Sequence, residues 1–179
     1  MMGIKENRMK IIEAMKLQKE LLVKAEDLRK KVSTYCADQS HETPVYGTEQ
    51  GEKIKEWIQA HSDVIKQINK LRVAVQRANL ETNVTIELGG KSVTKCIAEW
   101  IHRRRDLSAM ELSIWRGIGD RGLKEGLIRQ STGETYEVKI RRYYDPNERD
   151  NAVELYRNEP SIIDRTLEVV NAVTEVKAE

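Results

Sequence analysis

Three consecutive arginines, Arg103, Arg104 and Arg105, are the residues of this chain best suited to chemistry. They lie in a stretch whose apolar residues recur at helical spacing, and Arg104 stands three residues from both Ile101 and Leu107. An arginine keeps its proton, and burying it is costly unless an anion meets it. That anion is either a carboxylate of the same chain or a bound ligand, and the sequence allows both.

A ligand at these arginines would also meet side chains from two nearby segments. Guanidinium groups pair bidentately with phosphate and carboxylate, the turn after residue 78 adds neutral polar groups, and Trp100 could stack on a base. The candidate ligand-binding residues are therefore Arg103, Arg104, Arg105, Asn79, Thr82, Asn83 and Trp100. The alternative is an internal salt-bridge network, for which the candidate partners are Glu99, Asp106, Asp150 and Asp164.

Catalytic and metal-binding patterns are absent from the sequence. His41, His61 and His102 form no His-x-x-x-His or Cys/His group with metal spacing, and no nucleophile elbow or P-loop occurs. Cys36 and Cys96 lack a CxxC partner and are predicted to be reduced thiols. We therefore predict no catalytic residues, no metal and no cofactor, and a protein that is not an enzyme.

The composition favours long, solvated helices. Charged residues make up 34% of the chain, and there is no Phe and only three Pro. The net charge of +2 gives no global positive field, which argues against nucleic acid as a partner, although the segment 139–144 is locally basic and aromatic. No apolar run approaches the ~18 residues of a membrane span, and no signal core is present. We expect a cytoplasmic protein that does not contact membranes.

The hydrophobic pattern predicts a mainly α-helical single domain over 1–179, an antiparallel bundle of long, coiled-coil-like helices with one or two short β-hairpins. Because the first helix is long and near-heptad, it needs a partner helix within the chain or in another subunit, and we predict a homo-oligomer. The polar loop 38–51 could be mobile or functional. The predicted helices are 4–36, 52–79, 92–117 and two within 146–176, the second of which starts at Pro160 because Ser161 and Asp164 have capping-box spacing. The predicted hairpins are 84–95 and 127–143.

An Asn-x-x-Thr-x-Val pattern occurs twice, from Asn79 to Val84 and from Asn171 to Val176. Asn tolerates the left-handed conformation that ends a helix, and Thr suits the start of an extended segment, so both copies can be helix ends. The alternative is that their amide and hydroxyl groups line a shared polar pocket.

These segments resemble the septicolysin-like proteins, small helical proteins of bacteria and their phages. The resemblance implies a helical hairpin in which an Asn-x-x-Thr turn leads through a short Gly-containing loop to a helix with Arg-Arg-Asp. In a phage setting, the expected function is a homo-oligomeric sponge that captures a small anionic ligand, such as a nucleotide signal of host defence. The alternative is a coiled-coil scaffold without a small-molecule ligand. The matching residues are Ile68-Asn69, Asn79-Leu80-Glu81-Thr82-Asn83, Gly89-Gly90-Lys91-Ser92-Val93-Thr94, Arg103-Arg104-Arg105-Asp106-Leu107, Ile163-Asp164 and Val170-Asn171-Ala172-Val173-Thr174.

Overall fold

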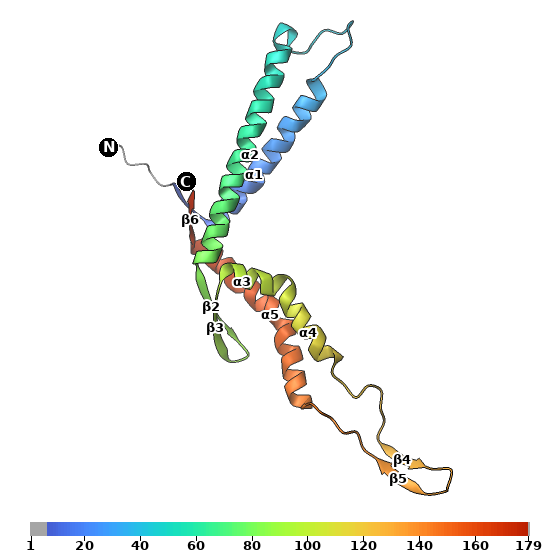
Figure 1. Ribbon diagram of the computed structural model, residues 1–179. Coiled ribbons are helices and arrows are strands. Elements are labelled where there is room, and N and C mark those ends of the chain that lie inside the picture. The colour runs from blue at the N-terminus through green and yellow to red at the C-terminus, as the bar shows by residue number, and fades with distance from the viewer. Residues whose placement is uncertain (1–6, 179) are drawn as a thin grey trace. The chain divides into compact units, whose positions relative to one another are not determined.

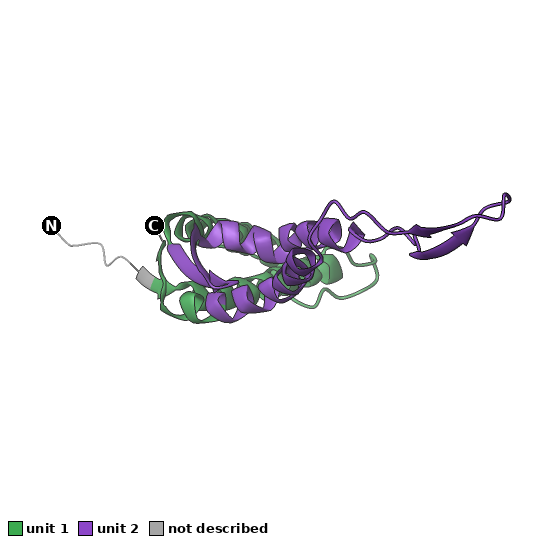
Figure 2. Ribbon diagram, turned by 90° about the horizontal axis from the view of Figure 1, so that it is seen from below, with its two compact units in different colours: residues 1–82, 168–179 green, residues 83–167 purple. Residues whose placement is uncertain are grey.

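The computed structural model describes residues 7–178, which are mainly helical with small two-stranded antiparallel sheets (Figure 1). The chain divides into two compact units, coloured separately in Figure 2. Unit 1 comprises Met1–Thr82 and Glu168–Glu179, and unit 2 comprises Asn83–Leu167. The prediction of one domain over 1–179 stays a prediction, and the two units are described separately. Helix α5 (Pro146–Val173) contributes residues to both units.

Unit 1 is built on two long helices, α1 (Ile11–Tyr35) and α2 (Gln50–Glu81), which pack along each other. Their apolar residues recur at intervals of three and four, so one face of each helix is buried against the other. The predicted helix 52–79 is confirmed with slightly wider bounds. The buried residues are Ile11, Ala14, Leu21, Ala25 and Leu28 in α1, and Val64, Ile68, Leu71, Ala74 and Ala78 in α2.

A small sheet in unit 1 pairs the strand before α1 with the strand after α5. Strand β1 (Asn7–Lys10) pairs antiparallel with β6 (Glu175–Ala178), and the amide of Ile11 donates to the carbonyl of Thr174 at 3.0 Å. The predicted helix 4–36 is therefore wrong over 7–10, while residues 4–6 lie outside the described part. The predicted C-terminal helix likewise ends at Val173 instead of residue 176. In both places, pairing between segments distant in sequence overrides a helical pattern.

The loop between α1 and α2 is anchored by aromatic packing. The ring of Tyr46 lies with its centroid 5.6 Å from that of Tyr35 and 5.4 Å from that of Trp57. The side chain of Gln50 donates to the carbonyl of Tyr35 at 2.8 Å, which satisfies a backbone group at the end of α1. A single turn of 3₁₀ helix, Gly47–Glu49, completes the connection. These contacts hold the loop against the helix ends.

Unit 2 begins with a hairpin of β2 (Asn83–Leu88) and β3 (Lys91–Cys96). Gly89 and Gly90 have φ angles of 57° and 76°, as a type I′ turn requires, and the predicted hairpin 84–95 is confirmed. The next helix starts at Ile97 instead of residue 92, because 92–96 belong to β3. The carboxylate of Glu99 accepts a hydrogen bond from the amide of Cys96 at 2.9 Å and so caps the first turn of this helix.

The helix that contains the arginines changes its winding midway. It runs as α3 (Ile97–His102), a wider π-helical turn η2 (Arg103–Leu107) and α4 (Ser108–Gly117). Helix α5 is continuous, although Pro160 was predicted to start a separate helix. Proline fits helical φ angles but has no N–H, so the carbonyl of Tyr156 lacks its usual partner at residue 160.

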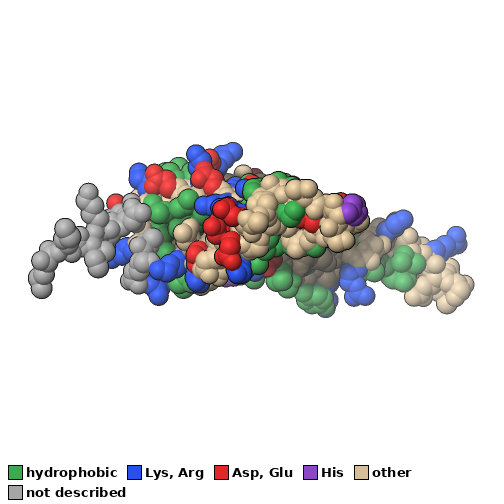
Figure 3. Space-filling model, turned by 90° about the horizontal axis from the view of Figure 1, so that it is seen from above, with side chains coloured by type: hydrophobic (Ala, Val, Ile, Leu, Met, Phe, Trp, Pro, Cys, Tyr) green, Lys and Arg blue, Asp and Glu red, His purple; other side chains and the backbone are tan. Residues whose placement is uncertain are grey.

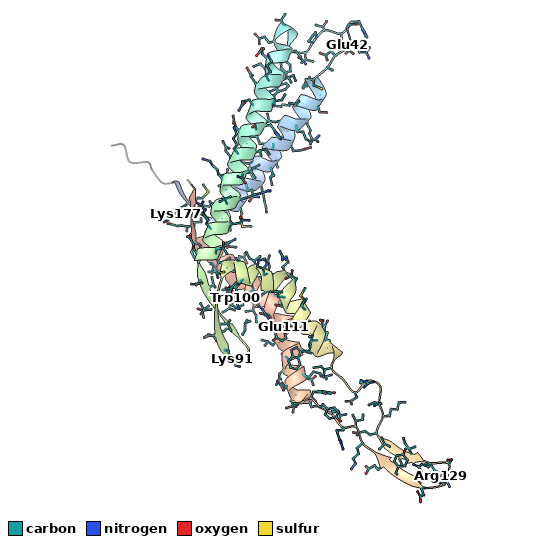
Figure 4. All side chains as sticks on the ribbon, in the orientation of Figure 1. Glu42, Lys91, Trp100, Glu111, Arg129 and Lys177 are labelled. Carbon is teal, nitrogen blue, oxygen red and sulfur yellow. The ribbon has the colours of Figure 1, made fainter. Side chains whose placement is uncertain are left out.

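A β-hairpin, named here the arm, connects α4 to α5. It consists of β4 (Gly126–Arg129) and β5 (Thr135–Val138), within the predicted hairpin 127–143 apart from Gly126. Asp120 holds the base of the arm by accepting hydrogen bonds from Nε of Arg142 at 2.7 Å and from the hydroxyl of Tyr144 at 3.0 Å. Figure 4 labels Arg129 at the outer end of β4.

Both Asn-x-x-Thr segments lie at helix ends, as the first interpretation predicted, but the left-handed asparagine on which it relied is wrong. Asn79 and Asn171 belong to the last turns of α2 and α5, and neither has a positive φ. The amides of Thr82 and Thr174 each donate four residues back, at 3.0 and 2.8 Å, and each segment continues as a strand with a buried valine. The order strand–helix–loop–helix–strand thus occurs twice, first from β1 to β2 and then from β3 to β6. The side-chain oxygens of Asn79 and Asn171 are buried and make no hydrogen bond within the described residues.

Candidate anion-binding site

Arg103, three residues after the buried Trp100 and at the start of the π turn, reaches a buried carboxylate of α5. Its Nε and Nη2 atoms donate to the two carboxylate oxygens of Glu159 at 2.6 and 2.8 Å. Glu159 is 2% exposed and the Arg103 side chain 21%, so this is a largely desolvated, bidentate ion pair. The hydrogen bond to Glu159 raises the pKa of Arg103 above its usual range.

Arg104 and Arg105 also meet carboxylates of their own chain. Arg104 Nη1 lies 2.6 Å from Asp164 Oδ1, with the two side chains 42% and 58% exposed. Arg105 Nε donates to Asp106 at 3.1 Å, and its Nη2 lies 3.2 Å from Nδ1 of His102. Asp106 and Asp164 were among the predicted partners, whereas Glu159 was not. The three arginines therefore form the internal ion pairs that the alternative interpretation predicted.

Trp100 connects two elements of unit 2 (Figure 4). Its side chain is fully buried, and its indole N–H donates to the carbonyl of Val84 in β2 at 2.9 Å. The predicted stacking of this ring on a base is corrected, because both the ring and its only polar group are occupied within the fold. Trp100 instead fixes the hairpin β2–β3 against α3.

A pocket of about 240 Å³ lies where this hairpin meets α3 and α5. Strand β3 contributes two lysines, the π turn contributes Arg103, and α5 contributes the ring of Tyr156, whose centroid is 5.7 Å from Cζ of Arg103. Aliphatic side chains form most of the remaining wall. The lining residues are Leu88, Lys91, Val93, Lys95, Trp100, Arg103, Leu155, Tyr156 and Glu159.

The charges around this pocket favour an anion. Lys91, Lys95 and Arg103 are cationic, and Glu159 is the carboxylate among the lining residues. Nζ of Lys95 is 3.9 Å from Glu99, a distant and exposed pairing, and no carboxylate of the described residues is paired with Lys91. Because apolar walls screen charges less than water does, the attraction of these cations for an anion is stronger here than on an open surface.

The ion pair at this pocket joins the π turn to the turn of α5 that precedes Pro160. The π turn begins at Arg103, and Pro160 immediately follows Glu159, the residue to which Arg103 is bonded. Single π turns occur often at functional sites, since they re-aim a side chain that a regular helix would point elsewhere. The π turn and the proline thus each interrupt the regular α-helical hydrogen bonding of an element that carries the buried ion pair.

A second, shallower depression of about 420 Å³ adjoins the pocket and shares Lys95 and Arg103 with it. Its further residues include Arg105 and His102, but also the carboxylates of Glu99 and Asp106. Positive and negative groups are nearly balanced there. The more enclosed pocket is therefore the better candidate for an anion.

The predicted site residues are only partly brought together. Arg103 and Trp100 line the pocket, and Arg105 lines the adjoining depression. Arg104 pairs with Asp164, and Asn83 is exposed in β2. Asn79 and Thr82 belong to unit 1.

The sequence interpretation missed Lys91, Lys95, Tyr156 and Glu159. A signal for the lysines was present, because Lys91, Val93 and Lys95 alternate at the spacing that puts them on one face of a strand. The residues from α5 had no such signal. Their position depends on the pairing of Arg103 with Glu159, 56 residues apart in sequence.

Among the described residues, no group of three or more His, Cys, Asp or Glu side chains could hold a metal ion. No helix in the same part of the chain is long and apolar enough to cross a membrane. Lys and Arg side chains are interspersed with Asp and Glu on the face shown in Figure 3.

No protein-family model matches this chain, and no curated protein sequence matches it. A solved structure is similar to it, the crystal structure of a functionally unknown conserved protein from Corynebacterium diphtheriae. The similarity covers 95% of this chain and 99% of the other, with a TM-score of 0.54 and 18% sequence identity. At this identity, the similarity concerns the fold alone.

Proposed function

We propose that this protein is a homo-oligomeric, non-enzymatic binding protein that captures a small anionic ligand in the pocket between β3, the π turn and α5. A nucleotide is the first ligand class to test. The observation that supports this proposal is the convergence of Lys91, Lys95 and Arg103 on an otherwise apolar pocket with one carboxylate, Glu159. Pre-formed concave sites of this kind, apolar with a few convergent polar groups, are typical of small-molecule binding.

The size of the pocket suits a compact ligand. Its volume of about 240 Å³ is below the ~300–1,000 Å³ typical of sites for drug-sized molecules. A phosphate or carboxylate could contact the cations while a small apolar or planar part lies against Leu88, Val93 and Leu155. If the ligand is a nucleotide signal, an oligomer that binds without turnover would act as the sponge implied by the septicolysin-like resemblance.

The test is thermal melting of the purified protein against mono-, di- and cyclic nucleotides and simple anions. A ligand present at about 100 times its Kd should stabilise the native state by about 2.7 kcal/mol. Lys91→Ala should remove this shift, because Lys91 lines the pocket and its exposed position makes it dispensable for folding. The matched control is Lys24→Ala, which removes the same charge from an exposed position of α1.

The control separates site binding from general electrostatic attraction. A shift lost in Lys91→Ala and kept in Lys24→Ala supports the pocket as the site, and recovery of the ligand unaltered after unfolding supports capture without catalysis. A flat panel, or equal shifts in the two variants, contradicts the proposal.

A scaffold without a small-molecule ligand is the second candidate, because all three arginines already have carboxylate partners. Large apolar side chains also remain exposed on the long helices, where further helices could complete a coiled-coil-like bundle. This candidate predicts a flat ligand panel with a stable oligomer that Leu22→Glu dissociates. The exposed apolar residues are Ile12, Met15, Leu22 and Val23 in α1, and Ile58, Ile65, Val73 and Leu80 in α2.

A further inference from the structure

The arm has an apolar face that is exposed at Ile128 and Tyr136 and half-buried at Val138. Ile128 of β4 is paired with Tyr136 of β5, and both side chains are exposed. Because side chains alternate along a strand, Tyr136 and Val138 share one face with Ile128. Ile140 follows two residues after the end of β5, and its amide donates to Glu125 at 3.0 Å, on the side of β4, as it would if the strand continued. A two-stranded hairpin is marginally stable on its own, whereas three or more strands with a hydrophobic face can be stable. The arm therefore lacks strands that a partner could supply.

The backbone of β5 has a free edge with a defined pattern. The amide of Gln130 donates to the carbonyl of Glu134 at 2.9 Å, which makes 130 and 134 a hydrogen-bonded pair of the arm. Hydrogen-bonded and non-bonded pairs alternate along an antiparallel ladder. The backbone groups of Tyr136 and Val138 consequently face β4, while those of Thr135 and Glu137 face outwards and can bond to another strand.

We propose that the β5 edges of two copies of this chain pair antiparallel about a twofold axis at Val138, forming a four-stranded sheet. This inference rests on the homo-oligomer of the proposed function and goes beyond it by naming the interface. It is independent of the anion pocket, because none of the residues that line the pocket belongs to the arm.

Charge selects this register from the possible ones. A twofold axis at Glu137 would place two glutamates opposite each other, and an axis at Lys139 would oppose two lysines, both of which are unfavourable. An axis at Tyr136 pairs Glu137 with Thr135 and gains no ion pair. With the axis at Val138, Glu137 of each copy lies opposite Lys139 of the other, so the interface gains two opposite-charge pairs.

The same register joins the apolar faces of the two arms. Tyr136 of one copy lies opposite Ile140 of the other, and Val138 lies opposite its own equivalent. Within one chain, Lys139 Nζ is 3.3 Å from Glu137, and both side chains are exposed. Exposed pairs of this kind contribute little, so exchanging this pair for pairs between copies costs little. The charged edge, which would repel an unrelated strand, thus complements a second copy.

Cysteine cross-linking tests the axis directly. Residues of a non-bonded antiparallel pair have Cα atoms about 4.5 Å apart, within the ~4.4–6.8 Å range that a disulfide spans. In a background that carries Cys36→Ser and Cys96→Ser, Val138→Cys should form a covalent dimer under mild oxidation, seen on non-reducing gels. Tyr136→Cys and Ile140→Cys should each fail to cross-link alone, but a mixture of these two variants should form a covalent heterodimer.

Charge exchange tests the register without cysteines. Glu137→Lys or Lys139→Glu alone should weaken self-association by on the order of tenfold, because each puts like charges opposite each other twice. The double variant with both changes should restore it, as measured by sedimentation velocity over a range of concentrations. Lys55→Glu, an exposed change of the same charge on α2, is the matched control.

Absence of the Val138→Cys dimer, or charge variants that associate like the wild type, would overturn this interface. Cross-linking by Tyr136→Cys alone would overturn the axis at Val138 in favour of one at Tyr136. If the wild type is a monomer at all concentrations, the interface and the oligomer fail together. Ligand binding, measured on the same variants by melting, reports separately on the pocket of Lys91.

Discussion

Removing Arg103 should destabilise the protein far more than removing its neighbour Arg104. In Arg103→Met, the carboxylate of Glu159, 2% exposed, is left without its partner. Breaking one side of a buried ion pair typically costs about 3–5 kcal/mol, and the 21% exposure of the Arg103 side chain favours the lower end. For a chain of this size, a loss of about 3 kcal/mol lowers Tm by roughly 6–12 °C.

Arg104→Met is the matched control, since it deletes an adjacent guanidinium whose ion pair is exposed. With its side chain 42% exposed and that of Asp164 58%, the loss should be about 0–1 kcal/mol. A double variant with methionine at both 103 and 159 should lie within about 1 kcal/mol of the wild type or above it, because no buried charge is then left unpaired. The two single losses should therefore be strongly non-additive.

Urea unfolding measures the loss of stability in each variant, and hydrogen exchange followed on peptides of unit 2 shows whether the loss occurs in the unit that contains the ion pair. Equal losses for the variants of Arg103 and Arg104, or a double variant as unstable as Arg103→Met, would refute this account of the pair.

Two further predictions concern the arm base and the buried tryptophan. Arg142 and Tyr144 lower the pKa of Asp120, mainly through the hydrogen bonds from Arg142. The ionised Asp120 therefore stabilises the fold above the ordinary aspartate pKa of about 3.9, and this stabilisation is lost as the pH falls through the lower pKa of the folded state. An NMR titration of the Asp120 carboxyl should give a midpoint below about 3.9, and this midpoint should rise in Arg142→Gln. An unchanged midpoint in that variant would contradict the assigned cause. Trp100→Phe should cost about 1–3 kcal/mol, because the carbonyl of Val84 loses its buried donor. A urea midpoint equal to that of the wild type would show that this carbonyl finds another partner.

The sequence was sufficient to predict the long helices and both hairpins, because these follow from local periodicity and turn residues. It failed where distant segments meet. Residues 7–10 continue a helical pattern, but they pair with β6 and are extended. Pro160 reads as a helix start, yet packing within unit 2 retains it in the interior of α5. Local signals cannot weigh such contacts, which form only once the chain is folded.

Prediction of the candidate site from the sequence was limited in the same way, by contacts between distant segments. Arg103 was identified by residue type, but the predicted apolar stripe ran through Ile101 and Leu107 and so turned Arg104 inwards. The buried face instead follows Ile97 and Trp100, and Arg103 comes three residues after Trp100, while Leu107 is exposed. Lys91 and Lys95 could have been found from the alternation in β3. Glu159 could not, because its partner lies 56 residues earlier in the chain.

The pairing of β1 with β6 sets the order in which the two units can fold during synthesis on the ribosome. Unit 2 is one continuous segment, whereas unit 1 needs residues from both ends of the described chain, as the bond from the Ile11 amide to the Thr174 carbonyl illustrates. At ~5–20 residues per second, the nascent helix α1 waits roughly 8–33 s for that partner. During this interval the side chain of Ile11, 1% exposed in the finished fold, lacks the strand that completes its surroundings. Strand β1 and the start of α1 are thus completed only once β6 has been translated.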